Sequence, residues 1–323
     1  LLGIVAGSTA GGGGPSLAAD GSAVRSGADA AEEGLIASPE PGWPQWRGPR
    51  RDAISHETGL LPAWPADGPR LLWKADGLGR GWSSPIVVQE RVYVTGDVGD
   101  DLVLFAFDLH GRLLWQAKNG VAWQGSFPGA RACGAYSQGR LYHLNAHGRL
   151  ACLDAADGRE VWAVDVLKRF HAENITWAIS ECLLIDGPRV IVTPGGPQTL
   201  VAALDKQTGQ TVWTSEPLDG ERTSYSSPIL FRYAGRRLIA NCSEGHGFGL
   251  DADRVGAVAG GDDGELAGVD ALDVGLVAGA LQVEGLGPLR ELHLDLPRRQ
   301  GVDKLGEQAR RYRRPALLFH AGP

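Results

Sequence analysis

Five residues that break the chain's internal pattern have side chains suited to ligand binding. They are an arginine, a glutamate and three aromatic residues that lie at the starts of otherwise similar segments: Trp82, Arg131, Trp177, Glu181 and Tyr225. Aromatic faces stack on planar or sugar-like rings, and a guanidinium adds directed hydrogen bonds and a positive charge. We therefore predict a ligand site where these segments meet. The alternative, in which these side chains pack loops and keep their charges solvated, stays open.

No motif in the chain points to a catalytic or metal-binding residue. His143 and His147 have the spacing His-x3-His, but on a strand and turn this spacing does not place both rings on one face. No Gly-x-Ser-x-Gly nucleophile motif occurs. We predict no catalytic residue, no metal site and no bound cofactor from the residues themselves.

The four cysteines form no C-x-x-C pair, which disfavours a zinc or thioredoxin-like site. They are Cys133, Cys152, Cys182 and Cys242. Buried, unpaired thiols are the simplest interpretation. A disulfide is possible if the protein is exported, and the sequence does not assign its pairing.

A repeated hairpin must position the candidate residues. In Ala203-Leu-Asp-Lys-Gln-Thr-Gly-Gln-Thr-Val-Trp213 an apolar strand leads into an Asp-to-Gly turn, and a second strand carries the tryptophan. The same order recurs twice, once with a turn one residue shorter, and Trp73 repeats only the final strand. We assign a structural role to these repeating residues, which are Trp73, Asp108, Gly111, Trp115, Asp154, Gly158, Trp162, Asp205, Gly209 and Trp213.

The spacing of this hairpin predicts an all-β fold. Its tryptophans recur at intervals of roughly 40 to 50 residues, and each interval has room for four short strands, which is the pattern of a β-propeller blade. A fourth unit begins at Tyr225, but the pattern fails after Asp251. Position 255 is Val where glycine is expected, and position 259 is Ala where tryptophan is expected.

Composition divides the 323 residues into three segments. Residues 1–40 read as a signal-peptide remnant, with Ala18 before a cleavage point, followed by a disordered linker, so we expect export to the periplasm or cell surface. Because the chain contains no methionine, we expect its native start to lie elsewhere. Residues 41–253 form the propeller segment. Residues 254–323 contain no Trp, Cys, Ser, Thr, Ile or Asn. We interpret them as a frameshifted tail, with a genuine low-complexity tail as the alternative.

The bulk properties exclude two kinds of partner. A net charge of -7 argues against a nucleic-acid partner, because nucleic-acid-binding domains carry basic surfaces. No apolar stretch is long enough to cross a membrane as a helix. The expected partner is an unidentified protein or small molecule.

Several stretches together resemble a known family. They are the Asp-turn-Trp hairpins, Trp43-Pro-Gln-Trp-Arg-Gly-Pro, Leu71-Leu-Trp-Lys, Ser83-Ser-Pro, Pro128-Gly-Ala-Arg131 and Val192-Thr-Pro-Gly-Gly196. The chain resembles the PQQ-binding-like, or quinoprotein-like, β-propeller repeat family, and in particular its secreted planctomycete-type members. The resemblance implies a ring of four-stranded blades whose first strands line a central channel. This chain would supply about three and a half blades and an N-terminal closing strand at Trp73, so the propeller would be truncated.

The resemblance leaves two functions open. The first is an exported, non-catalytic binding or scaffold module that holds a partner protein or small ligand at the channel face. The alternative is a PQQ-dependent alcohol or sugar dehydrogenase whose PQQ and calcium residues lie in the missing blades. Dehydrogenases of the family are distinguished by adjacent cysteines, and this chain has no Cys-Cys pair.

Overall fold

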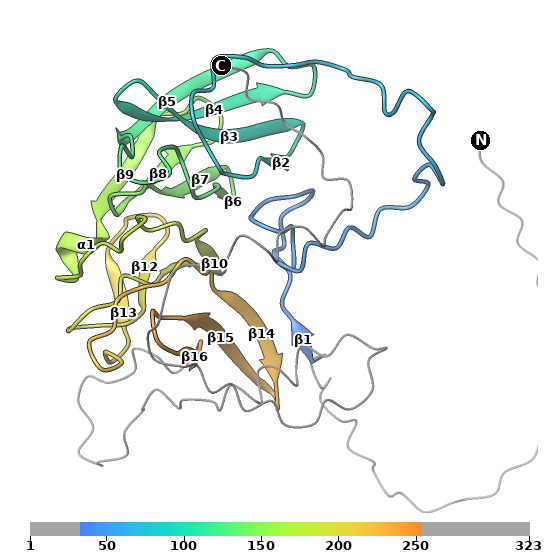
Figure 1. Ribbon diagram of the computed structural model, residues 1–323. Coiled ribbons are helices and arrows are strands. Elements are labelled where there is room, and N and C mark those ends of the chain that lie inside the picture. The colour runs from blue at the N-terminus through green and yellow to red at the C-terminus, as the bar shows by residue number, and fades with distance from the viewer. Residues whose placement is uncertain (1–32, 254–323) are drawn as a thin grey trace, which may run out of the picture. The chain divides into compact units, whose positions relative to one another are not determined.

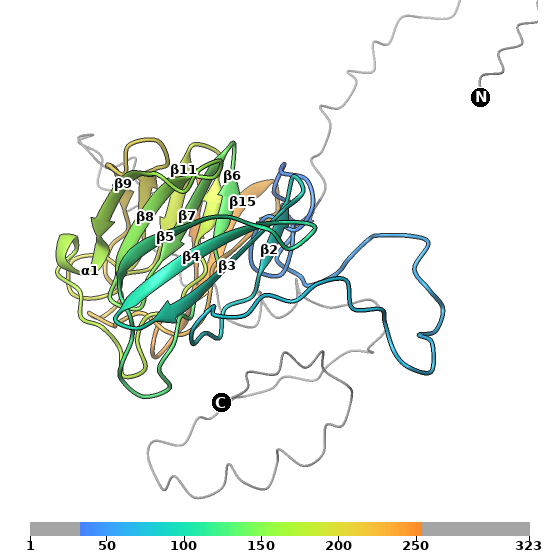
Figure 2. The same ribbon diagram turned by 90° about the horizontal axis from the view of Figure 1, so that it is seen from above.

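The structure is a computed structural model that describes residues 33–253. The predicted signal remnant and the predicted frameshifted tail fall on residues 1–32 and 254–323, outside the described residues. The described strands form four antiparallel sheets of four strands each, which follow one another in chain order (Figures 1 and 2). The prediction of an all-β fold built from four-stranded propeller blades is confirmed.

Three blades are built from consecutive strands. Blade 1 contains β2 (Ile86–Val88), β3 (Arg91–Val98), β4 (Asp101–Asp108) and β5 (Leu113–Val121). Blade 2 contains β6 (Ala135–Ser137), β7 (Arg140–Leu144), β8 (Arg149–Asp154) and β9 (Glu160–Asp165), which leads into the short helix α1 (Val166–Arg169). Blade 3 contains β10 (Leu184–Asp186), β11 (Arg189–Val192), β12 (Ala202–Asp205) and β13 (Thr211–Thr214).

The fourth blade recruits a strand from the N-terminal region of the chain. It contains β14 (Ile229–Tyr233), β15 (Arg236–Cys242) and β16 (Gly247–Asp251) in sequence order, and β1 (Gly34–Leu35) pairs with the free edge of β14. The sequence predicts that residues 34–35 belong to the linker of residues 1–40, and the structure instead pairs them in this sheet. Two residues carry too little periodic pattern to predict a strand.

The Asp-to-Gly turn has the same construction in blades 1, 2 and 3. The carboxylates of Asp108, Asp154 and Asp205 each accept backbone N–H bonds from the turn ahead, and a β-bulge lies just before each aspartate. The turn glycines have φ between 70° and 82°, which side-chain-bearing residues rarely adopt. These glycines are Gly111, Gly158 and Gly209.

Each turn glycine also receives the tryptophan that precedes it by one repeat. A Cβ atom at Gly158 would lie 2.5 Å from the ring of Trp115, so only glycine leaves room for the indole. The indole Nε1–H donates to the carbonyl of the residue after the turn aspartate, with Trp115 bonding Ala155 O at 3.1 Å. The same docking joins Trp73 to Gly111 and Leu109, and Trp162 to Gly209 and Lys206.

The core lies between neighbouring blades, at three junctions. One buried cluster combines residues of blades 1 and 2, including Tyr93, Trp115 and Leu141. A second combines blades 2 and 3, and a third combines blades 3 and 4. The first strands of adjacent blades approach one another, since β10 contacts both β6 and β14. The residues that lead into these first strands therefore converge.

Two segments before blade 1 pack against the sheets but are not strands of any described sheet. Trp73 stacks on Phe107 at a centroid distance of 5.9 Å, but residues 71–79 form no strand, so the closing strand predicted at Trp73 is absent from the described residues. Nearer the N-terminus, Trp43 exchanges backbone hydrogen bonds with Val87 of β2, and Trp46 packs on the core between blades 1 and 2. Within residues 33–253 no helix is long and apolar enough to cross a membrane.

Candidate functional site

Four equivalent positions, one from each blade, bring their side chains to one place. Each lies four residues before the first residue of its blade's first strand: Trp82 before β2, Arg131 before β6, Ser180 before β10 and Tyr225 before β14. Because the first strands of adjacent blades are neighbours, equivalent residues that precede them are neighbours too. The repeat therefore brings the backbone of these four positions together. Their side chains differ from blade to blade, and these side chains give the site its chemistry.

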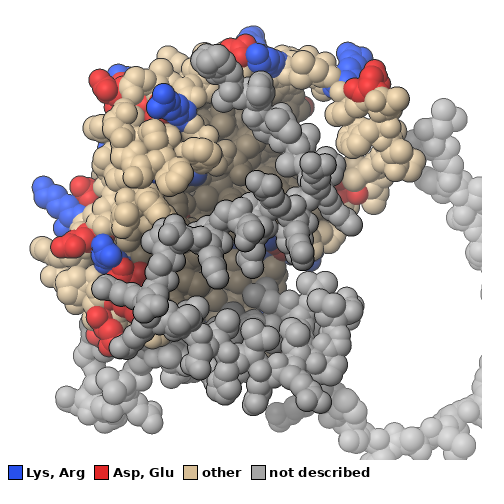
Figure 3. Space-filling model, viewed as in Figure 1, with Lys and Arg blue, Asp and Glu red and all other residues tan. Residues whose placement is uncertain are grey.

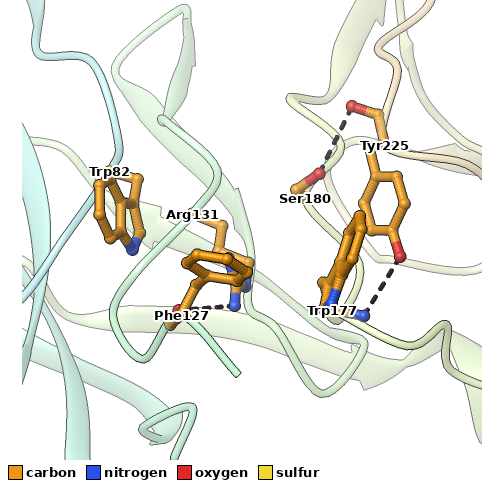
Figure 4. A pocket seen from close by; sticks show the side chains of 6 residues that line it. All are labelled: Trp82, Phe127, Arg131, Trp177, Ser180 and Tyr225. Carbon is orange, nitrogen blue, oxygen red and sulfur yellow. Dashed lines mark hydrogen bonds between the residues drawn. The ribbon is translucent and has the colours of Figure 1, made fainter. Parts of the chain in front are cut away.

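These four residues and two loop aromatics line one cavity (Figure 4). The additional residues are Phe127 and Trp177. The cavity volume is about 230 Å³, which is below the range of roughly 300–1,000 Å³ typical of sites that enclose a drug-sized ligand. The cavity therefore suits a single ring or a similar small group.

The aromatic side chains are exposed and held in defined orientations. Trp177 lies 5.5 Å from Tyr225 and meets Phe127 edge-on at 6.1 Å, measured between ring centroids. The Trp177 backbone N–H donates to the Tyr225 hydroxyl at 3.2 Å, and Trp82 Nε1–H donates to Pro128 O at 3.2 Å. The four rings are between 45% and 66% exposed. Exposed aromatics that converge on one cavity are typical of a binding surface.

Arg131 supplies the only charged group among the lining residues of this cavity. Its Nη2 donates to the carbonyls of Ser126 and Phe127, at 2.9 and 2.7 Å, which fixes the guanidinium and the loop together. The group also lies over the Trp123 ring, with its Cζ 5.7 Å from the centroid. Partial burial lowers the pKa of Arg131, and nearby Asp97 opposes that shift. Its Nε–H has no hydrogen-bond partner among the described residues.

Glu181 does not line this cavity, although we predicted it there. Its side chain is fully buried, and the Thr193 backbone N–H donates to both carboxylate oxygens at 3.1 Å. Burial raises the pKa of Glu181 to about 8, so the neutral acid predominates at pH 7. Neighbouring residues of an extended segment face opposite sides, so Ser180 faces the cavity and Glu181 faces the interior.

Sequence reasoning missed two lining residues, Phe127 and Ser180. Ser180 could have been found by applying the offset of Trp82, Arg131 and Tyr225 from their strands to blade 3 as well. Phe127 has φ of 53°, in the left-handed region, within the loop between β5 and β6. No repeat-based signal predicts its position.

The two histidines of the His-x3-His pair contact neighbouring groups of the fold. His143 is buried, its Nδ1 lies 2.9 Å from Asn119 Nδ2, and burial lowers its pKa to about 4. His147 approaches Ala122 O through Nε2 at 3.2 Å. No group of three or more His, Cys, Asp or Glu side chains within residues 33–253 is placed to hold a metal ion.

Charged side chains are distributed unevenly over the visible surface. In Figure 3 the visible Lys, Arg, Asp and Glu side chains lie mainly along the outer margin of the described residues. A second, larger cavity of about 550 Å³ lies around Asp97 and Trp123, and four of its ten lining residues are glycines. It gathers fewer side chains suited to ligand recognition than the first cavity.

Comparison with known proteins places the repeats in a family. The sequence matches the family model described as "Outer membrane protein assembly factor BamB" over residues 102–273, more than half of the chain. This match extends beyond residue 253, where we predicted the propeller segment to end.

Relatives of two functional kinds are similar to the chain. A quinohemoprotein alcohol dehydrogenase, ADH-IIG of Pseudomonas putida, is 29% identical over 148 residues, which are 43% of this chain and 20% of the dehydrogenase. BamB of Alkalilimnicola ehrlichii is 28% identical over 172 residues, which are 52% of this chain and 39% of that protein. The solved structure of BamB from Moraxella catarrhalis aligns with a TM-score of 0.37 and 17% identity, covering 55% of this chain and 46% of that one. The chain spans less than half the length of each of these relatives.

Proposed function

The chain belongs to the PQQ-like β-propeller repeat family whose model is described as outer membrane protein assembly factor BamB, and on that premise we propose that it acts as a non-catalytic binding module. The observation that carries the proposal is that four exposed aromatic rings converge around Arg131, beside the residues that lead into the first strands of the blades. Residues that repeat with the blade maintain the fold. These side chains do not repeat, and their exposure costs solubility without adding to the core.

The lining determines which group the cavity receives. Aromatic faces attract a flat or sugar-like ring, and Arg131 attracts an oxygen acceptor or a carboxylate on that ring. A volume of about 230 Å³ holds one such ring. We propose that a small ligand, or one side group of a partner protein, inserts a single ring into the cavity lined by these aromatic side chains and Arg131.

A titration of the full chain with ring compounds tests this proposal. Intrinsic tryptophan fluorescence and calorimetry are followed while methyl glucoside, cellotriose or 2-naphthoate is added. We expect at least one compound to bind, and Trp177→Ala to weaken its binding by about tenfold or more, because a stacked ring contributes roughly 1–3 kcal/mol. Arg131→Gln is expected to weaken binding of 2-naphthoate more than binding of the neutral sugars.

Trp64→Ala is the matched control, because Trp64 is 68% exposed and does not line the cavity. It is expected to leave binding within about twofold of the parent, as surface positions outside a site usually do. The proposal is wrong if no ring compound binds, or if Trp64→Ala and Trp177→Ala weaken binding equally.

A partner protein and an exported location are further elements of the proposal. The family is described by a protein that assembles outer membrane proteins, which favours a protein partner outside the cytoplasm. Fractionation of the source cells, followed by crosslinking with Trp177 replaced by a photoreactive amino acid, tests both elements. Crosslinks at position 177 and none at position 64 would support a partner at the channel face.

A PQQ-dependent dehydrogenase is the second candidate, because a quinohemoprotein alcohol dehydrogenase is among the similar proteins. Under this candidate the PQQ and calcium residues lie in blades outside the described residues. Calcium takes six to eight oxygen ligands, largely carboxylates, and no carboxylate lines the aromatic cavity. Reconstitution of the full chain with PQQ and calcium, followed by dye reduction with alcohols, separates this candidate from the binding module.

A further inference from the structure

Two cysteines from neighbouring blades lie side by side in the interior. Cys133 precedes β6 by two residues and Cys182 precedes β10 by two residues, so they hold the same position in blades 2 and 3. Their Sγ atoms are 3.5 Å apart, and both residues are buried. Disulfide bonds join sulfurs at about 2.05 Å, so closure requires a relative shift of about 1.5 Å.

The next junction shows what this position does without a second thiol. Its equivalent in blade 4 is Ser227, whose Oγ accepts a hydrogen bond from the Cys182 backbone N–H at 2.9 Å. In blade 3, Cys182 Sγ does the same and accepts a hydrogen bond from the Cys133 backbone N–H at 3.4 Å. A serine at this position therefore provides the hydrogen-bond acceptor that the backbone N–H of the preceding blade needs. What the cysteine pair adds is a reactive sulfur on each side of the junction between blades 2 and 3.

The surroundings favour a thiolate on one member of the pair. The hydrogen bond from Cys133 lowers the pKa of Cys182 to about 7, and the same bond raises the pKa of Cys133. The buried guanidinium of Arg51 adds positive charge here, because it donates to Cys182 O at 2.7 Å and to Leu183 O at 2.9 Å. A thiolate is the nucleophile in disulfide exchange, so Cys182 is the attacking residue.

We propose that Cys133 and Cys182 form a disulfide that joins blade 2 to blade 3, made by exchange with a low-molecular-weight disulfide. The thiolate of Cys182 attacks one sulfur of the added disulfide, which breaks its S–S bond and releases one thiolate. Cys133 then loses its proton to that thiolate and attacks Cys182 Sγ, which releases a second thiolate. The two cysteines are oxidised by two electrons, and the added disulfide is reduced to two thiols.

The cysteine pair is close in sequence to the aromatic cavity, although neither cysteine lines it. Arg131 and Ser180 line the cavity, and each lies two residues before one of the cysteines. The other two cysteines lack a nearby thiol of this kind. Cys152 is buried beside Tyr142, and Cys242 is exposed on β15. They are internal controls in every experiment on the full chain.

Peptide mapping after oxidation tests the assignment. The reduced full chain is incubated with oxidised glutathione, denatured, alkylated and digested without reductant. We expect one crosslinked peptide that contains Cys133 and Cys182, with the loss of two titratable thiols from the interior. We also expect oxidation to raise Tm by roughly 5–15 °C, because the bond closes a long loop. The proposal is overturned if both cysteines are alkylated after oxidation, or if either one is crosslinked to Cys152 or Cys242.

Cys182→Ser is the informative variant because serine already fills this place in blade 4. It keeps an acceptor for the Cys133 backbone N–H and removes the second sulfur. We expect no crosslink and no rise in Tm on oxidation of this variant, with Cys133→Ser as a second variant should the first fold poorly. An equal rise in Tm in the parent and in both variants would show that the gain does not come from this bond.

Discussion

The junctions that lead into blades 1, 2 and 3 differ from the junction between blades 3 and 4 at a single tryptophan. In the first three, the indole Nε1–H donates to the carbonyl after the turn aspartate. At the fourth, Trp213 is buried but its Nε1 has no hydrogen-bond partner among the described residues. The equivalent carbonyl, Ala252 O, accepts Arg189 Nη1 at 3.0 Å. At the junction between blades 1 and 2, Ala155 O likewise accepts Arg91 Nη1, and it also accepts Trp115 Nε1.

This difference shows that the repeated unit is shared between two blades. The tryptophan belongs to one blade, and the glycine and carbonyl that receive it belong to the next. At the fourth junction the sequence has Val255 in place of the glycine, at a position outside the described residues. The aspartate half of the turn persists there, since Asp251 Oδ1 accepts the Asp253 N–H at 3.0 Å. The two halves of the motif are therefore separable.

The largest effect is expected from removal of a tryptophan that is enclosed between two blades. Trp115 is 9% exposed and packs in the cluster shared by blades 1 and 2. Trp115→Ala should cost about 3–5 kcal/mol of unfolding free energy, as truncation of a buried aromatic residue does. Trp73 docks in the same way but is only partly buried, so Trp73→Ala should cost about half as much. Urea unfolding measures both, and equal costs would show that the enclosing blade adds nothing.

The glycine under the indole gives the next effect. Gly158→Ala places a Cβ atom 2.5 Å from Trp115 at a φ of 77°, so steric overlap adds to backbone strain. We expect a loss of about 2–4 kcal/mol. Gly139 has the same φ of 77° with no atom within 4 Å of the added Cβ, so Gly139→Ala isolates the strain, at about 1–2 kcal/mol. If both substitutions cost the same in urea unfolding, the indole does not require glycine.

Exchange of tryptophan for phenylalanine compares the two kinds of junction directly. Trp115→Phe removes a donor that is paired with Ala155 O, and Trp213→Phe removes a donor that has no partner among the described residues. Both variants lose a similar ring volume, so the difference reports the hydrogen bond. We expect Trp115→Phe to be more destabilising by about 1–2 kcal/mol. A larger loss for Trp213→Phe in the same urea titration would show that its indole N–H is satisfied in solution.

The repeat made much of this architecture predictable from the sequence. The Asp, Gly and Trp offsets predicted the hairpins, and the irregular residues at the starts of the blades predicted four of the six residues around the cavity. Glu181 was misplaced because we did not carry the offset of Arg131 into blade 3, where it falls on Ser180. An error of one residue on an extended segment exchanges the exposed and buried faces.

Other features depend on contacts that no local pattern encodes. The pairing of β1 with β14 joins residues about 200 positions apart through two residues of strand. The missing hydrogen bond of the Trp213 indole among the described residues depends on side-chain geometry across a junction. The approach of Cys133 to Cys182 follows from the blade period, but only after the first strands have been aligned by structure.

The smallest effect concerns the aspartate half of the turn, in which the two kinds of junction should behave alike. Backbone hydrogen bonding, chiefly from Ala156, lowers the pKa of Asp154, and Arg140 adds to the shift. A lowered folded-state pKa stabilises the fold at pH values above the unfolded value of about 3.9, and this gain is lost as pH falls through the folded pKa.

Asp154→Asn keeps an acceptor oxygen and removes the charge, so it should lower Tm by only about 1–2 °C at pH 7, and by progressively less as the pH falls below the unfolded value of about 3.9. Asp251→Asn should show a loss of the same small size, because its turn also retains the bond from the residue two positions ahead. Asp67→Asn, at an exposed aspartate outside these turns, is the control for general charge effects. A loss at Asp154 that does not shrink as the pH is lowered would assign the effect to shape and not to charge. A large loss at Asp251 alone would show that the last turn depends on its aspartate more than the complete turns do.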